Sequence, residues 1–335
     1  MRVAIDTSYT ARGPSGTGVY VERLITALEA EGVDVVRLRQ PLRAQPGGGN
    51  KLRSAANAAL DLAWTRELLP RAAARAKADV LHHPLPASSP TRIPQVVTVH
   101  DVAFARLPDE FAAVWRRVAL RTHRTAVERA GAVIAVSATS ARDASAWLAA
   151  RPERIVIAPH GPGQELKTPV IRTPEHFLYV GDDEPRKNVD GLLEAHARYG
   201  GARPLVLAGR AAHKAAAGVI GIPNPTAETL ADLHARAIAL VHPSRDEGFG
   251  LTVLEAMAIG TPVIATRSGA IEELAGDAAL IVDEADLADA MRRVEQDERL
   301  RHRLASAGRA RAEAFSWKRS AKAHIEAYTL ARDHR

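Results

Sequence analysis

Two glutamates stand close together in the stretch RDEGFGLTVLEAMAIG, residues 245–260, where residue types and spacing could bind a charged ligand. Glu247 lies before a turn that contains two glycines, and Glu255 lies further on, in a run with helical character. The apolar run Ile238–Val241 predicts a strand before the turn, and Leu251–Ile259 predicts a helix after it. One carboxylate is therefore expected just before a helix and the other inside it.

Glycines make this turn suitable for close contact with a ligand. Gly248 and Gly250 have no side chains, so the backbone can approach a bound group. The first N–H groups of the predicted helix have no partner within it and attract an anion. Because Glu247 and Glu255 would repel that anion, they are expected to accept hydrogen bonds from sugar hydroxyls beside it. The segment predicts a phosphate site flanked by hydroxyl-rich groups.

A basic pair follows another predicted strand in YVGDDEPRKN, residues 179–188. Arg186 can bind a phosphate with two parallel hydrogen bonds, and Lys187 can act as a point charge, so the pair suits a diphosphate. A solvated basic pair is the alternative interpretation. The neighbouring acidic pair, Asp182 and Asp183, raises the question of a metal, although such a pair in a turn is usually exposed to solvent.

The first half of the chain offers weaker candidates. The strand VVTVHD ends in His100 and Asp101, where a parallel sheet presents residues to a ligand; a hydrogen-bonded strand end is the alternative. The loop RGPSGTGVY, residues 12–20, contains Gly16 and Gly18 before a predicted helix and could hold an anion, or could be a plain tight turn. Its glycines do not follow the dinucleotide-binding pattern, which argues against a nicotinamide dehydrogenase.

Composition narrows the class of protein. The chain has 335 residues, 46% of them hydrophobic, and no cysteine, which favours two globular domains and excludes disulfides and thiol chemistry. Residues 1–165 carry 22 Lys+Arg against 15 Asp+Glu, whereas residues 166–335 carry 23 against 24, so the net charge of +6 comes from the first half. Aromatic residues total 4% and none alternate with basic residues, which argues against nucleic-acid binding. The N-terminus resembles a buried strand rather than a signal peptide, and a cytoplasmic protein is expected.

Short apolar runs alternate with amphipathic stretches, as in parallel sheets covered by helices on both faces. The six strands predicted in the first half are Val3–Ile5, Val35–Leu38, Val80–His82, Val96–Val99, Val133–Val136 and Ile155–Ile157. The six predicted in the second half are Phe177–Val180, Leu205–Ala208, Val219–Ile220, Ile238–Val241, Val263–Ala265 and Leu280–Val282. The Pro- and Gly-rich stretch at 160–174 predicts a linker, and two doubly wound domains would place a ligand in the cleft between them.

These motifs resemble the retaining nucleotide-sugar glycosyltransferases of family 4, which have the GT-B fold of two Rossmann-like domains. In the second half the resemblance rests on Glu247 and Glu255 within PSRDEGFGLTVLEAMAIGTPVIAT, and on YVGDDEPRKNVDGLLEA. In the first half it rests on GTGVYVERL, VVTVHDVAF, VIAVSATSARD and IAPHG. The resemblance implies an acceptor-side domain at 1–165, a nucleotide-sugar domain at 166–315, and a last helix at 316–335 that crosses back to the first domain.

The resemblance also implies roles for individual residues. Arg186 and Lys187 match the residues that stabilise the departing nucleoside diphosphate, and Glu255 matches the ribose contact. The grip on donor sugar and phosphate falls to Glu247 with the backbone of Gly248, Phe249, Gly250 and Leu251. In the first domain, His100, which Asp101 follows, matches the cleft histidine that faces the anomeric carbon, and Gly16 and Gly18 match the glycine loop near the diphosphate. Many relatives have Ser, Thr or Arg where this chain has Asp182.

The expected reaction is transfer of a hexose, with mannose or glucose as the guess, from a GDP- or UDP-linked donor to a glycan, glycolipid or polyprenyl-linked acceptor. The resemblance implies retention of configuration. No second carboxylate supplies the pair that retaining glycosidases use, so a same-face mechanism without metal or other cofactor is expected. His82 and His83 end another strand, but no further residue completes a metal triad. A catalytically silent subunit that binds nucleotide sugar or a partner enzyme is the alternative.

An arginine-rich helix is predicted within residues 110–130. At helical spacing Phe111, Trp115, Val118 and Thr122 share a face, beside a stripe of arginines at positions 117, 121 and 124. The stretch could contact the anionic inner face of the cell membrane, or it could bind a lipid-diphosphate acceptor. It could equally be an ordinary packed helix with a solvated basic face. Residues 51–77 are a second, weaker candidate for the same role.

Overall fold

A computed structural model describes residues 1–12, 15–41, 51–163 and 173–333. They form two compact units: unit 1 comprises Met1–Gly161 and Ser316–Arg335, and unit 2 comprises Pro162–Phe315. Parts of two predicted segments, the loop at 12–20 and the linker at 160–174, lie outside the described residues.

Unit 1 is built on a parallel sheet whose strands follow the order β2-β1-β3-β4-β5-β6. The strands are β1 (Arg2–Asp6), β2 (Asp34–Leu38), β3 (Val80–His83), β4 (Gln95–Val99), β5 (Ala132–Ala135) and β6 (Ile155–Ile157). The helices are α1 (Gly16–Ala30), α2 (Lys51–Ala63), α3 (Leu69–Arg75), α4 (Ala103–Arg106), α5 (Ala113–Arg129), α6 (Ala138–Leu148) and α13 (Trp317–Asp333), with a π-helical turn at Trp64–Leu68 between α2 and α3.

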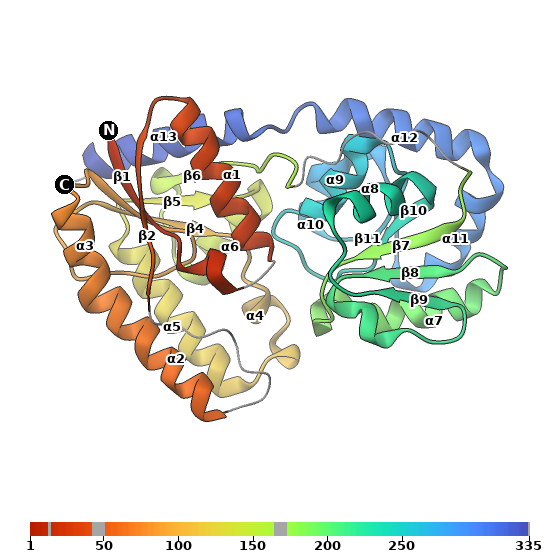
Figure 1. The fold of residues 1–335 in the computed structure, drawn as a ribbon, viewed down its shortest axis with the longest axis horizontal. Helices are drawn as coiled ribbons and strands as arrows, with labels where there is room; N and C mark the ends of the chain where they lie inside the picture. The colour runs from red at the N-terminus through yellow and green to blue at the C-terminus, as the bar shows by residue number, and fades with distance from the viewer. Residues whose placement is uncertain (13–14, 42–50, 164–172, 334–335) are drawn as a thin grey trace. The chain divides into compact units, whose positions relative to one another are not determined.

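Alternate residues of each strand send their side chains to opposite faces of the unit 1 sheet. Val96 joins a core with α1 and α13 on one face, and its neighbour Val97 joins a core with α5 and α6 on the other. Figure 1 shows α13, in blue, beside α1 although they stand at opposite ends of the sequence. The C-terminal helix is therefore part of the core of unit 1.

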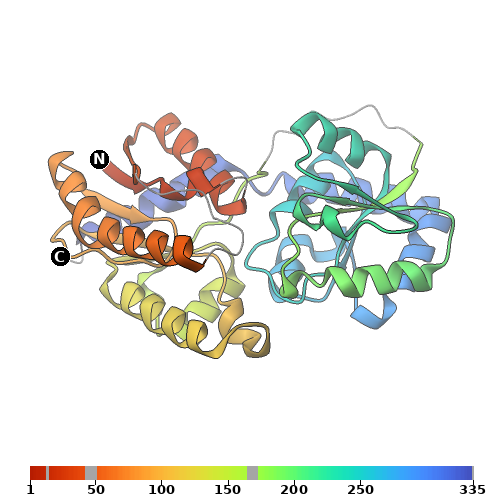
Figure 2. The ribbon, with the colours of Figure 1, turned by 60° about the horizontal axis from the view of Figure 1, so that its bottom comes forward.

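Unit 2 has the strand order β12-β11-β10-β7-β8-β9, again all parallel. The strands are β7 (His176–Val180), β8 (Leu205–Ala208), β9 (Val219–Ile222), β10 (Ala237–His242), β11 (Val263–Thr266) and β12 (Leu280–Val282). The helices are α7 (Val189–Tyr199), α8 (Ala227–Arg236), α9 (Leu251–Ile259), α10 (Gly269–Ala275), α11 (Leu287–Gln296) and α12 (Glu298–Ala312). Figure 2 shows the sheet of unit 2 with helices on both of its faces.

The direction of winding reverses between β7 and β10, which are neighbours in the sheet of unit 2. In doubly wound sheets, ligands bind beyond the carboxyl ends of the strands at such a reversal. The residues that follow β7 and β10 are therefore the first to consider as a site. The predicted fold class is confirmed, since a strand lies at each of the twelve predicted positions with ends shifted by at most two residues.

The structure bears on the two interpretations of the arginine-rich helix, a docking surface or an ordinary packed helix. Trp115 and Val118 of α5 are 52% and 57% exposed, whereas the buried side of the helix is formed by Ala119, Ala126 and Val127. The small alanines allow α5 to lie close against the sheet. The larger apolar side chains that the sequence placed on a common face therefore remain at the surface.

Candidate active site

Three charged or titratable side chains meet at the carboxyl ends of β7 and β10. Lys187, in the turn after β7, places its Nζ 2.5 Å from Oε1 of Glu247, which follows β10. Nε2 of His242, the last residue of β10, lies 3.0 Å from the same oxygen. The contact of Lys187 with Glu247 joins residues 60 positions apart in sequence, at the point where the winding of the sheet reverses.

The surroundings of Glu247 keep it ionised. Burial alone would raise the pKa of this carboxyl group, but the nearby Lys187, His242 and Arg186 outweigh burial and hold the pKa well below its ordinary value. Glu247 is therefore an anion whose charge is balanced by its neighbours. Its oxygens can accept hydrogen bonds from hydroxyl groups, as the sequence predicted.

Arg186 is held by oxygen atoms of its own surroundings. Its NH1 donates to the carbonyl of Asp246 at 3.2 Å and lies 3.5 Å from Oε2 of Glu247, while its Nε donates to Glu184 at 2.9 Å. Its side chain is only 17% exposed. The predicted basic pair is therefore present beside Glu247, but Arg186 has fewer N–H groups left for a phosphate than the sequence suggested.

Helix α9, which begins after Gly250, follows Glu247 of this cluster by four residues. Gly250 caps it at φ +98°, a conformation that other residues rarely adopt, and no side chain of the cap accepts from the first turn. Phe249 is buried and meets Phe315 edge to face at 5.8 Å. Glu255 is buried one turn further along α9. The start of α9 therefore suits an anion, because the first N–H groups of a helix have no partner within it.

In unit 1, the ring of His100 is fixed in one tautomer. Its Nε2 lies 3.0 Å from the carbonyl oxygen of Pro84, and because a carbonyl only accepts, Nε2 carries the hydrogen. Burial lowers the pKa of His100, although Pro84 and Asp101 oppose the shift. The neutral ring therefore offers Nδ1 as an acceptor. The ring of Tyr20 packs edge-on against it at 4.9 Å.

The other predicted residues of unit 1 have local structural contacts. Oδ1 of Asp101 accepts from the backbone N–H of Ala103 at 3.1 Å, at the start of α4. The N–H of Gly18 donates to Oγ of Ser15, the cap of α1, at 3.1 Å. That N–H is therefore not directed at an anion, whereas Gly16 is the first residue of the helix. Their binding roles stay predictions.

The sequence did not single out His242 or Tyr20. His242 ends β10 as His100 follows β4, so its place at a strand end was the available signal. Tyr20 gave no such signal, because it lies within a helix and its partners are distant in sequence. Its hydroxyl lies 2.8 Å from Oγ1 of Thr98 and 2.9 Å from Nε2 of His324, which belongs to α13.

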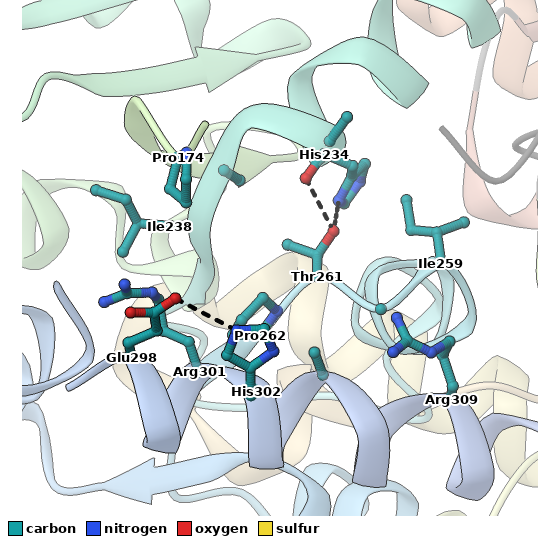
Figure 3. A pocket seen from close by; sticks show the side chains of 14 residues that line it. Pro174, His234, Ile238, Ile259, Thr261, Pro262, Glu298, Arg301, His302 and Arg309 are labelled. Atoms are coloured by element: carbon teal, nitrogen blue, oxygen red, sulfur yellow. Dashed lines mark hydrogen bonds and ion pairs between the residues drawn. The ribbon is translucent and has the colours of Figure 1, made fainter. Parts of the chain in front are cut away.

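The apolar pocket drawn in Figure 3 lies away from this cluster, at the amino ends rather than the carboxyl ends of the strands of unit 2. Its volume is about 620 Å³, and it is bounded by the amino ends of β10 and β11 and by α12. His234 and Thr261 are hydrogen-bonded on one side, and Arg301 and Arg309 of α12 lie on another. The size suits a small molecule, but the charged cluster that could bind a diphosphate is elsewhere.

The described residues lack two features that would point to other functions. They contain no group of three or more His, Asp or Glu side chains arranged to hold a metal ion. Within the same residues, none of the helices combines the length and apolarity needed to cross a membrane.

Comparison with known proteins identifies the class. Two family models match: the one described as Glycosyltransferase Family 4 covers residues 14–162, and the one described as Glycosyl transferases group 1 covers residues 166–311. Two parallel doubly wound units with these matches define a glycosyltransferase of the GT-B fold. The chain belongs to the family 4 glycosyltransferases.

The similar proteins include curated relatives and solved structures. The O-antigen chain mannosyltransferase B of Escherichia coli is 35% identical over 46% of this chain and 46% of its own length. A D-inositol 3-phosphate glycosyltransferase of Geodermatophilus obscurus is 33% identical over 61% of this chain and 54% of its own length. The chain thus spans about half the length of these relatives. The structure of Anabaena HepE in complex with UDP-glucose has a TM-score of 0.73 at 17% identity, covering 97% of this chain and 98% of HepE.

Proposed function

We propose that this chain is a retaining hexosyltransferase that uses a nucleotide-diphosphate sugar. The observation that carries the proposal is the cluster of Lys187, Glu247 and His242 next to the start of α9, which no side chain of the cap residue satisfies. A positive group and a helix N-terminus suit a diphosphate, and an ionised carboxylate beside them suits the hydroxyls of the attached sugar. The structures of relatives with UDP-glucose support a nucleotide-sugar donor.

The chemistry follows from where charge develops. As the glycosidic bond of the donor breaks, negative charge grows on the leaving diphosphate, and Lys187 with the N–H groups of α9 would stabilise it. Glu247 would accept hydrogen bonds from the sugar, and Glu255 from the ribose. In unit 1, Nδ1 of the neutral His100 is suited to accept a hydrogen bond from a hydroxyl group. With cations of the protein beside the diphosphate, the proposed reaction uses no metal or other cofactor.

The proposed stereochemistry is retention by a same-face route. Glu247 is held between Lys187 and His242, which lowers its basicity and its value as a nucleophile. The departing diphosphate, placed beside the acceptor hydroxyl, would then take its proton. Mannose is the favoured sugar because of the relative that transfers mannose, and GDP and UDP are both candidates for the nucleotide. A glycan or a glycolipid is the proposed acceptor.

The test of the proposed activity uses Glu247→Gln, which keeps the size of the side chain but removes its charge. The wild-type protein is expected to release nucleoside diphosphate from GDP-mannose or UDP-glucose, and the variant to lose this activity by about a hundredfold. Calorimetry should show that the variant still binds GDP or UDP. If the wild type bound donor but turned over none of a broad panel, a silent binding subunit would replace the proposal.

We also propose that unit 1 docks on an anionic membrane through α5. Val114, Trp115 and Val118 expose large apolar surfaces, and Arg117 and Arg121 lie within the same turns. An adjoining groove of about 830 Å³ separates α5 from α2 and the π-helical turn, and its walls include Leu62 and three arginines, Arg66, Arg121 and Arg129, against two acids, Asp61 and Glu67. Apolar side chains mixed with arginines suit the interface of an anionic lipid layer.

A further inference from the structure

The acid at position 182 is matched by a cation from the neighbouring strand. Asp182 follows β7, and Arg210 follows β8, which pairs with β7. Nε of Arg210 donates to Oδ1 of Asp182 at 2.7 Å, and its NH2 donates to Oδ2, so the pair is bidentate. This geometry is the strong form of an arginine–carboxylate pair. Asp182 is thus compensated by Arg210 rather than by Lys187 or Arg186.

The backbone fixes the position of Arg210 as well. Gly181 directly follows β7, and Gly209 directly follows β8. The two glycines are in contact, because a Cβ added to Gly209 would lie 2.8 Å from the carbonyl oxygen of Gly181. Gly209 has φ +102°, so any other residue there would be strained. The N–H of Ala211 also donates to the Gly181 carbonyl. Arg210 therefore extends from a tight double turn whose backbone cannot easily shift.

A chain of alternating charges connects Arg210 to the candidate donor site. Asp182 and Glu184 both act electrostatically on Arg210 and favour its charged form, which raises its pKa. Glu184 in turn pairs with Nε of Arg186, and Arg186 lies beside Glu247. The cations and anions thus follow the carboxyl ends of β8, β7 and β10 in one row.

Arg210 differs from Arg186 in how much of its side chain is exposed to a ligand. The side chain of Arg210 is 67% exposed, whereas that of Arg186 is 17% exposed and donates to Glu184 and Asp246. A guanidinium has five N–H donors, and the pair with Asp182 uses two of them. Arg210 thus combines a fixed orientation with exposed donors.

We propose that Arg210, oriented by Asp182, is a further phosphate-binding residue of the donor site and takes a nucleoside diphosphate from the β8 side. The proposal rests on the proposed function. It assigns to Arg210 the bidentate contact for which Arg186 has few donors left. It also gives Asp182 a role: this acid positions an arginine that reaches the donor from the next strand.

The experiment compares Arg210→Ala with Arg203→Ala by calorimetry with GDP, UDP and the phosphate-free guanosine and uridine. Arg203 is a matched control, because it precedes β8 as Arg210 follows it and is likewise an exposed arginine paired with a carboxylate, Glu295. Arg210→Ala is expected to weaken nucleoside diphosphate binding about tenfold, as for loss of a hydrogen bond to a charged group. Binding of the nucleoside and the behaviour of Arg203→Ala should stay unchanged.

A double variant separates direct contact from simple neutralisation of Asp182. If Arg210 only screened Asp182, then Arg210→Ala with Asp182→Ala would bind diphosphate as the wild type does, and the proposal would be overturned. Continued weak binding by a double variant with wild-type thermal stability supports it. Unchanged binding by Arg210→Ala, or equal losses for nucleoside and diphosphate, also overturns it. A wild-type chain that binds neither GDP nor UDP would instead contradict the proposed function itself.

Discussion

At the residue scale, Lys187 is expected to interact with two anions, Glu247 and the leaving diphosphate. In the described structure it neutralises Glu247, and in the proposed reaction it also stabilises the leaving diphosphate. Both demands fall on one ammonium group, which has three donors and no fixed plane and can therefore serve two acceptors at once. Its contribution should grow as charge moves onto the diphosphate, so it should affect kcat more than donor binding.

Lys187→Gln is therefore expected to lower kcat by about a hundredfold to a thousandfold, the range for loss of one group that stabilises transition-state charge. Lys214→Gln is the matched control, since Lys214 is a lysine of unit 2 with similar exposure that pairs with Asp183 and Asp190. Initial rates of nucleoside diphosphate release at saturating donor would measure both variants. Equal losses in the two would show that a general loss of charge, rather than the position of Lys187, causes the effect.

The sequence predicted Lys187 and Glu247 of this cluster because each follows an apolar strand, but it did not single out His242. Local pattern gave the position of Glu247 relative to α9, and the family resemblance added the roles. The contact between Asp182 and Arg210 could not be predicted, because it depends on the pairing of β7 with β8 across 28 positions of sequence. The contacts of Arg186 with Glu184 and Asp246 could not be predicted from the sequence pattern either.

At the scale of elements, α13 is held in unit 1 by buried polar contacts as well as by apolar packing. Nε2 of His324 contacts the hydroxyl of Tyr20, and its Nδ1 lies 2.7 Å from the carbonyl of Ser320, so Nδ1 carries the hydrogen. The hydroxyl of Tyr328 lies 2.9 Å from Nδ1 of His82 on β3. The family resemblance predicted a last helix, but these contacts join residues up to 304 positions apart and left no local signal.

These histidines should make unit 1 sensitive to acid. Burial, with the nearby His100, lowers the pKa of His324 to about 4, although its contact with Ser320 opposes the shift. Because a histidine of the unfolded chain has a pKa near 6.5, the unfolded state takes up protons first as the pH falls. Stability is therefore fully present above about pH 6.5 and is lost toward pH 4, by up to about 1.4 kcal/mol per pH unit for each such histidine.

Denaturant unfolding followed by tryptophan fluorescence would measure this effect in unit 1 alone. All four tryptophans, Trp64, Trp115, Trp147 and Trp317, belong to that unit. His324→Gln should flatten the dependence of unfolding free energy on pH, whereas His302→Gln, which changes an exposed histidine of α12, should not. A slope between pH 6.5 and 4 that is the same in wild type and His324→Gln would contradict the prediction.

At the scale of the whole molecule, charge and large exposed apolar side chains are both unevenly distributed along the sequence. The excess of basic residues lies in the first half of the sequence, and the large exposed apolar side chains Val114, Trp115 and Val118 lie there on one helix. Composition predicted the first of these features, but exposure could not be read from the pattern. The pattern of α5 fits burial of either side, and the small residues Ala119 and Ala126 face the core because they let the helix approach the sheet.

The proposed docking can be tested with sedimenting vesicles. The wild type should bind vesicles that contain phosphatidylglycerol more than vesicles of phosphatidylcholine alone, and added salt should weaken the binding because it screens the arginines. Val114→Asp with Val118→Asp should abolish most of it, since two carboxylates replace the exposed apolar surface. Ser306→Asp with Ala310→Asp is the matched control, an exposed pair with the same spacing on α12. Binding that is insensitive to the α5 pair, or equal for neutral vesicles, would show that α5 does not carry the interaction.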